Sequence, residues 1–269
     1  MVYFSQKGGI SMDKRKIIYY TDELNDEFSL AEITPKYIGG DYVYGHTSLF
    51  KRFTHFFWYR IMAMPIAFFY TKLALYHRIV GAEVLRPYRK TGYFLYGNHT
   101  HDIGDAFMPN MIEKRKDKYM IVHPNNVSMP YLGRITPSLG AIPLPDDLAA
   151  HRHFNEIIER RIREGHAIVI YPEAHIWPFY TGIRPFPDTS FAYPIKLGVP
   201  AFCFTNTYQR RGKSKRPRVV TYIDGPFFED TSLPPRARRK DLRDRIHATM
   251  VRRAENSNMT VIRYVKKED

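Results

Sequence analysis

Short apolar runs alternate with stretches of helical periodicity from residue 92 onward. The runs are rich in Tyr, Val, Ile and Phe and are bounded by Gly, Pro or Asn, which is typical of buried strands. They cover residues 92–97, 119–123, 140–144, 167–173, 200–208 and 218–226. Apolar residues also recur at helical spacing from Phe154 to Ile162 and stop at Gly165, which predicts a helix over about 149–165. A second helix is predicted near 191–198.

Strands separated by helices predict an α/β fold, in which we expect a mixed central sheet flanked by helices. The 269 residues suffice for one large domain with appendages. We divide the chain into an N-terminal arm (1–48), an apolar, aromatic helix pair (49–81) and an α/β domain with a basic C-terminal tail (82–269). Residues 13–45 show no sustained period, so the arm is predicted to be irregular and to pack on another part of the chain.

The segment 49–81 is the most apolar part of the chain, yet its aromatic residues are interleaved with Lys and Arg. Its longest uncharged run, Ile61–Thr71, has 11 residues, too few for a helix that crosses a membrane. Pro65 is expected to divide the segment into two short helices. The pattern fits a helix pair lying in the plane of a membrane surface and, equally, a helix pair in a soluble core.

The N-terminus lacks the apolar stretch of a signal peptide, which predicts a cytoplasmic protein. The sequence "MDKRK" reads as an ordinary start, so the true start is either Met1 or Met12. The single cysteine, Cys203, lies in an apolar run and is predicted to be a buried thiol in a reducing compartment.

The chain carries 41 Lys and Arg against 27 Asp and Glu, a formal net charge of +14, and should therefore be attracted to polyanions. The two candidate polyanions are nucleic acid and an anionic membrane surface. The aromatic residues concentrate at 53–70 and not within the basic tail, as a base-stacking surface would require. We therefore expect a membrane surface and no nucleic acid, and keep a basic nucleic-acid-binding protein only as an alternative. Since the chain has no Gly-rich phosphate loop, we expect neither ATP nor NAD and no other cofactor.

Two histidines and two aspartates crowd the stretch "LYGNHTHDIGDAF", directly after a predicted strand. His99 and His101 form an H-x-H pair of the kind found in zinc hydrolases. That motif continues with Asp and His, where this chain has Ile103 and Gly104, so a zinc-dependent hydrolase is kept only as the alternative and no metal is predicted. The preferred interpretation is a His–Asp pair, in which a carboxylate fixes the imidazole so that its other nitrogen can take a proton from a hydroxyl.

This stretch resembles the N-H-x4-D block of the glycerolipid acyltransferase family typified by the 1-acylglycerol-3-phosphate acyltransferases. Three further blocks resemble those of the family and follow in the same order. They are "YMIVHPNNVSMPYLGRITPSLGAIPL", "AIVIYPEAHIW" and "GIRPFPDTSFAYPIKLGVPAFCFT". The resemblance covers roughly residues 50–225, and the aromatic helix pair before the first block also suits the family.

The spacing of the first block departs from the family pattern. Five residues separate His99 from Asp105, one more than in the family, and Asp102 is only three positions beyond His99. We predict Asp105 as the partner, with the extra residue absorbed near Gly104, whose backbone tolerates unusual dihedral angles. Pairing of His99 with Asp102, or of His101 with Asp105, remains open.

The resemblance implies transfer of a fatty acyl group to a lysophospholipid or a related glycerolipid hydroxyl. The donor would be a thioester, either acyl-CoA or acyl-carrier protein, or an acyl-phosphate. His99 would be the general base and Asp105 its orienting partner. The protein would be peripheral, on the cytoplasmic face of the cell membrane.

Substrate binding is harder to assign, because two family arginines are replaced by Asp146 and Ile176. Glu173 is expected to orient the acceptor or its basic partners, or else to be a structural hydrogen-bond acceptor. The predicted substrate-binding residues are Asn98, His101, Arg134, Glu173, Arg184 and Lys196.

Overall fold

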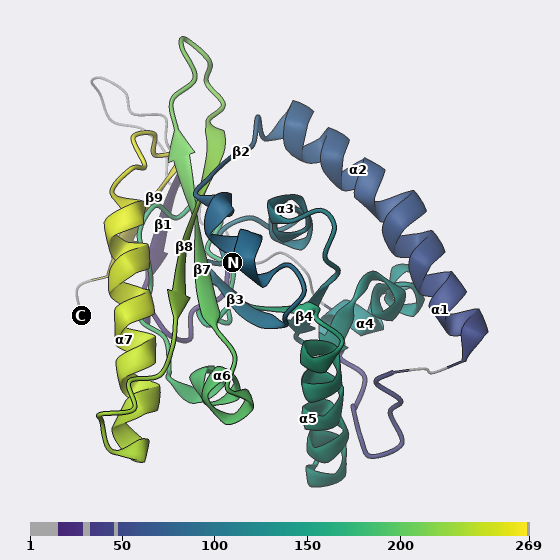
Figure 1. The fold of residues 1–269 in the computed structure, drawn as a ribbon. Helices are drawn as coiled ribbons and strands as arrows, with labels where there is room; N and C mark the ends of the chain where they lie inside the picture. Colours follow the sequence, from purple (N-terminus) through teal and green to yellow (C-terminus); the bar gives the residue numbers. More distant parts are fainter. Residues whose placement is uncertain (1–15, 29–32, 46–47, 268–269) are drawn as a thin grey trace.

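A seven-stranded sheet forms the centre of the protein in a computed structural model that describes residues 16–28, 33–45 and 48–267 (Figure 1). The strand order is β2-β8-β7-β3-β6-β4-β5. Five strands run in one direction, while β8 is antiparallel to β7 and carries β2 parallel to itself. The mixed sheet that the sequence predicts is confirmed. Its strands are β2 (Arg78–Val80), β3 (Tyr93–Gly97), β4 (Lys118–Val122), β5 (Ala141–Pro143), β6 (Ala167–Ile170), β7 (Ala201–Gln209) and β8 (Arg218–Phe227).

Helices cover both faces of the sheet, so the central strands are apolar on both sides. Phe94 and Tyr96 of β3 pack in one core cluster, while Tyr93 and Leu95 pack in another. The first face is covered by α5 (Leu148–Arg163), α6 (Ala192–Leu197) and α7 (Pro235–Ala254), and the second by η3 (Ala82–Tyr88) and α3 (Gly104–Ile112). Short helical turns complete the connections: α4 (Asn125–Ser128), η4 (Leu132–Arg134), η5 (Thr136–Leu139) and η6 (Thr189–Phe191). Cys203 lies in β7 and is fully buried, as predicted.

The apolar segment forms one long curved helix instead of the predicted helix pair (Figure 1). The helix passes without interruption through α1 (Leu49–His55), η1 (Phe56–Ala63), α2 (Met64–Phe69) and η2 (Tyr70–Ala74). The turn before Pro65 is a π-helical one, in which the N–H of Met64 bonds to the carbonyl of Tyr59. Such a widened turn accommodates the proline ring without breaking the helix. No helix in the described part of the chain is both long enough and apolar enough to cross a membrane.

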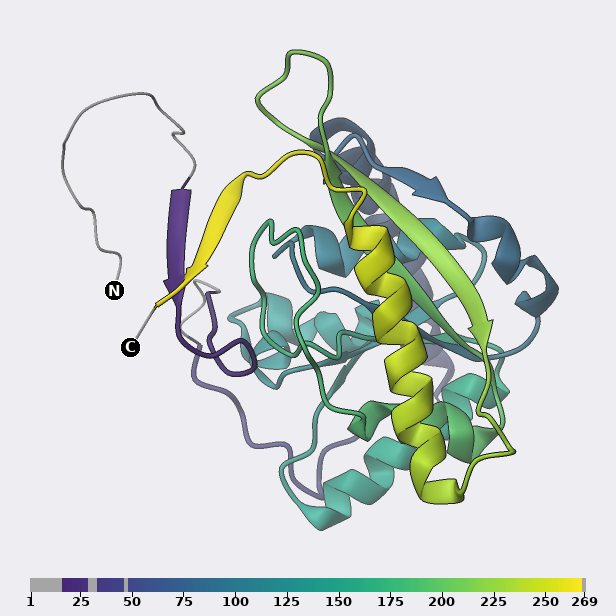
Figure 2. The ribbon, with the colours of Figure 1, turned by 90° about the vertical axis from the view of Figure 1, so that its left-hand side faces the viewer.

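The two ends of the described chain pair with each other in a small second sheet (Figure 2). Strand β1 (Lys16–Tyr20) runs parallel to β9 (Ile262–Lys266). The arm is therefore regular over these residues, whereas the sequence predicted an irregular arm. The prediction failed because the partner strand lies more than 240 residues away, so no local pattern reveals the pairing. The alternative starts, Met1 and Met12, lie outside the described residues.

The chain ends cover one loop of the main domain through Trp177, which is fully buried. Its ring stacks on Tyr264 with a centroid distance of 4.9 Å and packs against Tyr20 and Phe28. The indole N–H donates to the carbonyl of Asp26 at 2.8 Å. The loop that follows β6 is thus fixed by residues from both ends of the chain.

A buried histidine connects the long helix to the sheet. His77 lies between η2 and β2, and its Nε2 is 2.7 Å from Oγ1 of Thr221. Since that hydroxyl donates to Oδ1 of Asn206, the imidazole is the donor in this contact. Burial lowers the pKa of His77 from 6.5 to about 4.

The low pKa of His77 predicts a loss of stability in mild acid. Unfolded His77 binds a proton below pH 6.5, whereas the folded protein excludes this proton until pH is near 4. Its contribution is therefore complete above pH 6.5 and falls by roughly 3 kcal/mol as pH decreases to 4. His77→Gln keeps an N–H donor but does not titrate. We expect its free energy of unfolding, measured in urea, to decrease less than that of the wild type over this range.

A matched control is His123→Gln, which replaces an exposed histidine. Its stability should follow the wild-type pH dependence. Parallel curves for wild type and His77→Gln would contradict the buried, neutral state of His77.

Candidate active site

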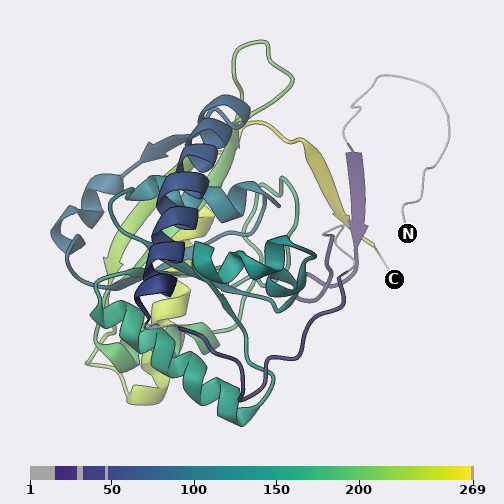
Figure 3. The same ribbon diagram turned by 90° about the vertical axis from the view of Figure 1, so that its right-hand side faces the viewer.

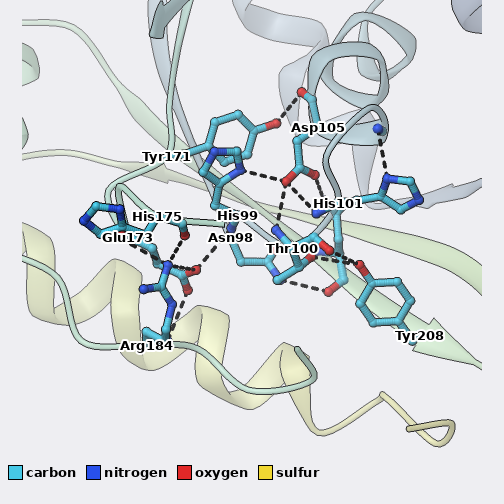
Figure 4. Close-up of polar contacts among 12 residues, drawn as sticks. Asn98, His99, Thr100, His101, Asp105, Tyr171, Glu173, His175, Arg184 and Tyr208 are labelled. Atoms are coloured by element: carbon cyan, nitrogen blue, oxygen red, sulfur yellow. Dashed lines mark hydrogen bonds and ion pairs between the residues drawn. The ribbon is translucent and has the colours of Figure 1, made fainter. Parts of the chain in front are cut away.

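His99 and Asp105 lie together where β3 ends and α3 begins (Figure 4). Nδ1 of His99 is 2.8 Å from Oδ2 of Asp105. The same oxygen accepts the backbone N–H groups of Thr100 at 2.8 Å and His101 at 2.9 Å. Asp105 is 2% exposed, whereas Asp102 lies on the exposed side of the loop. Of the pairings left open by the sequence, the structure contains the one between His99 and Asp105.

The hydrogen bond to Asp105 sets the proton position on His99. An ionised carboxylate only accepts hydrogen bonds, so the proton lies on Nδ1 and Nε2 is left with a free lone pair. The ring stacks on Tyr171 at a centroid distance of 4.4 Å and an angle of 17°. The Tyr171 hydroxyl donates to the carbonyl oxygen of Asp105 at 2.6 Å. The imidazole is therefore held in one plane, with Nε2 available as a base.

Gly104 allows the ring of His101 to lie close to the start of α3, because it has no side chain. A Cβ at this position would lie 2.9 Å from Cγ and Nδ1 of the His101 ring. Gly104 is the first residue of α3, and its N–H donates to Nδ1 of His101 at 3.0 Å. The expectation that Gly104 provides unusual dihedral angles is wrong, because close approach of a neighbouring ring is what requires glycine here.

His101 is a neutral imidazole beside the pair. Because its Nδ1 accepts the N–H of Gly104, its proton lies on Nε2. Burial lowers its pKa, and the two nearby aspartates oppose this only in part. Its ring packs against Phe179 and Tyr70. Of the predicted substrate-binding residues, His101 lies in the same loop as His99 and is still partly accessible.

Asn98 ties β3 to β7 and is not placed to bind a substrate. It is 1% exposed. Its Nδ2 donates to the carbonyl of Asn206 at 3.0 Å, and its Oδ1 accepts the N–H of Asn206 at 2.8 Å. The prediction for Asn98 is therefore corrected to a structural role.

A buried polar chain that the sequence analysis missed continues from Asp105. Nδ2 of Asn206 is 3.4 Å from Oδ1 of Asp105, and Oδ1 of Asn206 accepts the hydroxyl of Thr221. Thr221 in turn accepts from His77. The sequence did contain a signal for this chain of contacts, namely the polar residues inside the apolar runs at 200–208 and 218–226. A polar group in a buried strand needs a hydrogen-bond partner.

Glu173 and Arg184 form a fully buried ion pair behind His99. The side chains of both residues are 0% exposed, and Nη2 of Arg184 is 3.5 Å from Oε2 of Glu173. That oxygen also accepts the backbone N–H of His99 at 3.1 Å, and Oε1 accepts the N–H of Arg184 at 3.1 Å. Burial raises the pKa of Glu173 and lowers that of Arg184, and the attraction between the two charges opposes both shifts.

The two terminal nitrogens of the Arg184 guanidinium bond within the protein, while its buried Nε has no hydrogen-bond partner among the described residues. The guanidinium donates to the carbonyl oxygens of Glu23, Glu173 and His175 and lies over the ring of Trp177. The predictions that Arg184 and Glu173 bind substrate are therefore corrected. Both are buried, and Glu173 has the structural role that the sequence analysis kept as its alternative.

The two other predicted cations lie away from His99. Lys196 is exposed on α6, which leads into the N-terminal end of β7, whereas His99 follows the C-terminal end of the parallel neighbour β3. Arg134 lies in η4 and lines a cavity to which neither His99 nor Asp105 contributes. Both predictions are corrected on this ground.

The alternative of a zinc site at the H-x-H pair requires a group of metal ligands around His99 and His101. Across residues 16–28, 33–45 and 48–267, no three His, Cys, Asp or Glu side chains are grouped so that they could hold a metal ion. The Nδ1 atoms of His99 and His101 are both engaged within the loop.

Comparison with known proteins gives a match at the level of structure. No family model matches the sequence, and neither does any curated protein. A solved structure with a similar fold is the 1-acyl-sn-glycerophosphate (LPA) acyltransferase PlsC from Thermotoga maritima, with 16% sequence identity and a TM-score of 0.50. The match covers 76% of this chain and 87% of that chain. The protein thus has a glycerolipid acyltransferase-like fold, as the resemblance of its sequence blocks implied.

Proposed function

We propose that the protein is an acyltransferase that moves a fatty acyl group from an activated donor to the hydroxyl of a glycerolipid. The observation that carries this proposal is the His99–Asp105 pair at the end of β3, within a glycerolipid acyltransferase-like fold. Nε2 of His99 takes the proton of the acceptor hydroxyl as its oxygen attacks the acyl carbonyl carbon. The carbon–sulfur bond of a thioester donor then breaks, and His99 returns the proton to the departing thiolate. Asp105 stabilises the imidazolium between these two events.

A direct transfer, without an acyl-enzyme, agrees with the surroundings of His99. The single cysteine is buried in β7, where burial raises the pKa of its thiol. The hydroxyl of Thr100 faces Tyr208 at 3.0 Å, and Thr100 is fully buried. The acceptor hydroxyl itself is therefore the nucleophile in the proposed reaction.

The proposed acceptor is a lysophospholipid or related glycerolipid, and the proposed donor is acyl-CoA, acyl-carrier protein or an acyl-phosphate. The donors and the phosphate of a lysophospholipid carry negative charge. The hairpin that joins β7 to β8 is positively charged. It lies at the same end of the sheet as the C-terminal end of β3, because β3 and β7 are parallel. Its basic residues are Arg210, Arg211, Lys213, Lys215, Arg216 and Arg218.

We further propose that the protein is peripheral and lies on the cytoplasmic face of the membrane. The long helix exposes a row of large apolar side chains, among them Phe53, Phe56 and Phe69 at 62%, 54% and 59% exposure. Lys51, Arg52 and Lys72 lie beside them on the same helix. Exposed aromatic residues flanked by cations are typical of a helix that rests in the headgroup region of an anionic bilayer.

The catalytic pair predicts a difference between two neighbouring aspartates. Asp105→Asn removes the charge that stabilises the imidazolium, so acyl transfer should fall by roughly 10²- to 10⁴-fold. Asp102→Asn is the matched control and should retain activity, because Asp102 is exposed and does not bond to His99. Both rates would be measured from formation of the acylated lipid. A dead Asp102→Asn enzyme together with an active Asp105→Asn enzyme would contradict the assignment.

The membrane proposal predicts that exposed aromatic residues contribute to binding and not to folding. Phe53, Phe56 and Phe69 replaced together by Ser should weaken binding to phosphatidylglycerol vesicles by at least about 100-fold, since each buried Phe contributes about 1.5–3 kcal/mol. Circular dichroism should be unchanged. The control Phe228→Ser, at an exposed position outside the long helix, should bind as the wild type does. Unchanged vesicle binding by the triple variant would refute the proposed surface.

A further inference from the structure

A hollow in the protein surface lies where the N-terminal arm crosses the core. Its volume is about 840 Å³. Its walls come from residues 36–45 of the arm, from α1, from the turns η4 and η5 and from the C-terminal end of α5, and Tyr119 and Ile142 of the sheet line its base. Figure 3 shows the arm, α1 and α5 side by side at the lower end of the long helix. His99 and Asp105 do not line this cavity, so it is separate from the candidate active site.

The cavity is lined by more positive than negative charge. Its acidic residues are Asp117 and Glu164, and each is already neutralised. Asp117 pairs with Arg60 and faces His55 at 3.5 Å, and Glu164 pairs with two arginines of α5 at 3.0 and 2.6 Å. Among the described residues, four lining cations make no ion pair with any carboxylate. These four are Lys36, Lys51, Arg52 and Arg134.

Four buried side-chain atoms of the lining are without a hydrogen-bond partner among the described residues. Nε2 of His55 and Oδ1 of Asp117 belong to the ion pairs described above, which leaves the hydroxyl of Tyr44 and Nε of Arg161. The Arg161 guanidinium lies over the ring of Tyr119 at 4.4 Å, and His55 stacks on the same ring at an angle of 10°. This arrangement holds the donors of Arg161 in place against a rigid aromatic ring. Buried donors in folded proteins are normally paired, so these groups favour a polar ligand.

The geometry points to a binding site for a phosphate monoester. Four uncompensated cations exceed the charge of a single carboxylate and suit a phosphate dianion. Two of the four are arginines, whose planar forks match phosphate oxygens in bidentate hydrogen bonds. A volume of about 840 Å³ lies within the range of small-molecule sites, roughly 300–1,000 Å³. The site does not depend on the proposed acyl transfer.

This phosphate could belong to a soluble metabolite or to a lipid headgroup. The second source is physically accessible because α1, which forms one wall, exposes Leu49, Phe50 and Phe53. Both sources present the same chemistry to the cavity. The experiment therefore uses one probe of each kind that shares the same headgroup: glycerol 3-phosphate, and phosphatidic acid in phosphatidylcholine vesicles.

The test variant is Arg52→Ala/Arg134→Ala, which removes one cation from α1 and one from η4. Both side chains are exposed, so thermal unfolding should match that of the wild type. The control Arg236→Ala/Lys240→Ala removes two exposed cations from α7, so its net charge equals that of the test variant. Binding of glycerol 3-phosphate would be measured by calorimetry and binding of vesicles by sedimentation. Vesicles in which phosphatidylglycerol replaces phosphatidic acid, matched in surface charge, report non-specific attraction.

We expect wild type and control to bind at least one probe, and the test variant to bind that probe at least about 100-fold more weakly, roughly tenfold for each charged contact. Loss for glycerol 3-phosphate alone identifies a soluble ligand. Loss for phosphatidic acid, without the same loss for phosphatidylglycerol, identifies a lipid headgroup. The proposal is overturned if the wild type binds neither probe, if the test variant binds as the control does, or if the loss is equal for the two anionic lipids and absent for glycerol 3-phosphate.

Discussion

The carboxylate of Asp105 organises the loop between β3 and α3. One of its oxygens accepts three N–H groups, from the imidazole of His99 and from the backbone of Thr100 and His101. Three donors can converge on one oxygen only if the chain turns back tightly after β3. Gly104 at the start of α3 suits this turn, because a Cβ there would lie 2.9 Å from the ring of His101. The position of the base thus follows from the contacts of a single buried carboxylate.

The rest of the structure holds this loop in place through buried polar contacts. Asn98 binds the backbone of β7, and Glu173 binds the N–H of His99. Glu173 is paired with Arg184, which also donates to the N-terminal arm at Glu23. A buried ion pair contributes little net stability, because desolvation of both charges offsets their attraction. The ion pair instead fixes the position of His99, since it connects the backbone of this residue to a loop that both chain ends cover.

Sequence patterns predicted the features that depend on neighbouring residues. Alternating apolar runs and helical periods indicated the mixed sheet, and the order of the sequence blocks pointed to the glycerolipid acyltransferase-like fold. The pairing of His99 with Asp105 was also accessible, because the two residues lie within one short loop. Pairing of β1 with β9 was not accessible, since residues at opposite ends of the chain meet only in the folded protein.

Burial of charged residues was the property that the sequence could not reveal. Arg184 was expected to meet a substrate, yet its guanidinium is enclosed by three carbonyl oxygens and a tryptophan ring. Arg134 and Lys196 were expected beside it, but lie at other parts of the surface. An arginine that binds a ligand and one that binds the protein interior look alike in a sequence. The sequence also did not reveal that the helix continues through Pro65. This continuity depends on a π-helical turn, which is a feature of backbone geometry and cannot be read from composition.

His99 is proposed as the general base for transfer of an acyl group from an activated donor to a lipid hydroxyl. The most direct measurement is the fate of an isotopically labelled acyl chain, supplied as acyl-CoA together with lysophospholipids and followed by mass spectrometry of the lipid products. We expect the label to appear as a new ester on the lysophospholipid with the wild-type protein and not with His99→Ala, whose fold should be intact by circular dichroism. Release of the label only as free fatty acid, or ester formation that persists in His99→Ala, would contradict it.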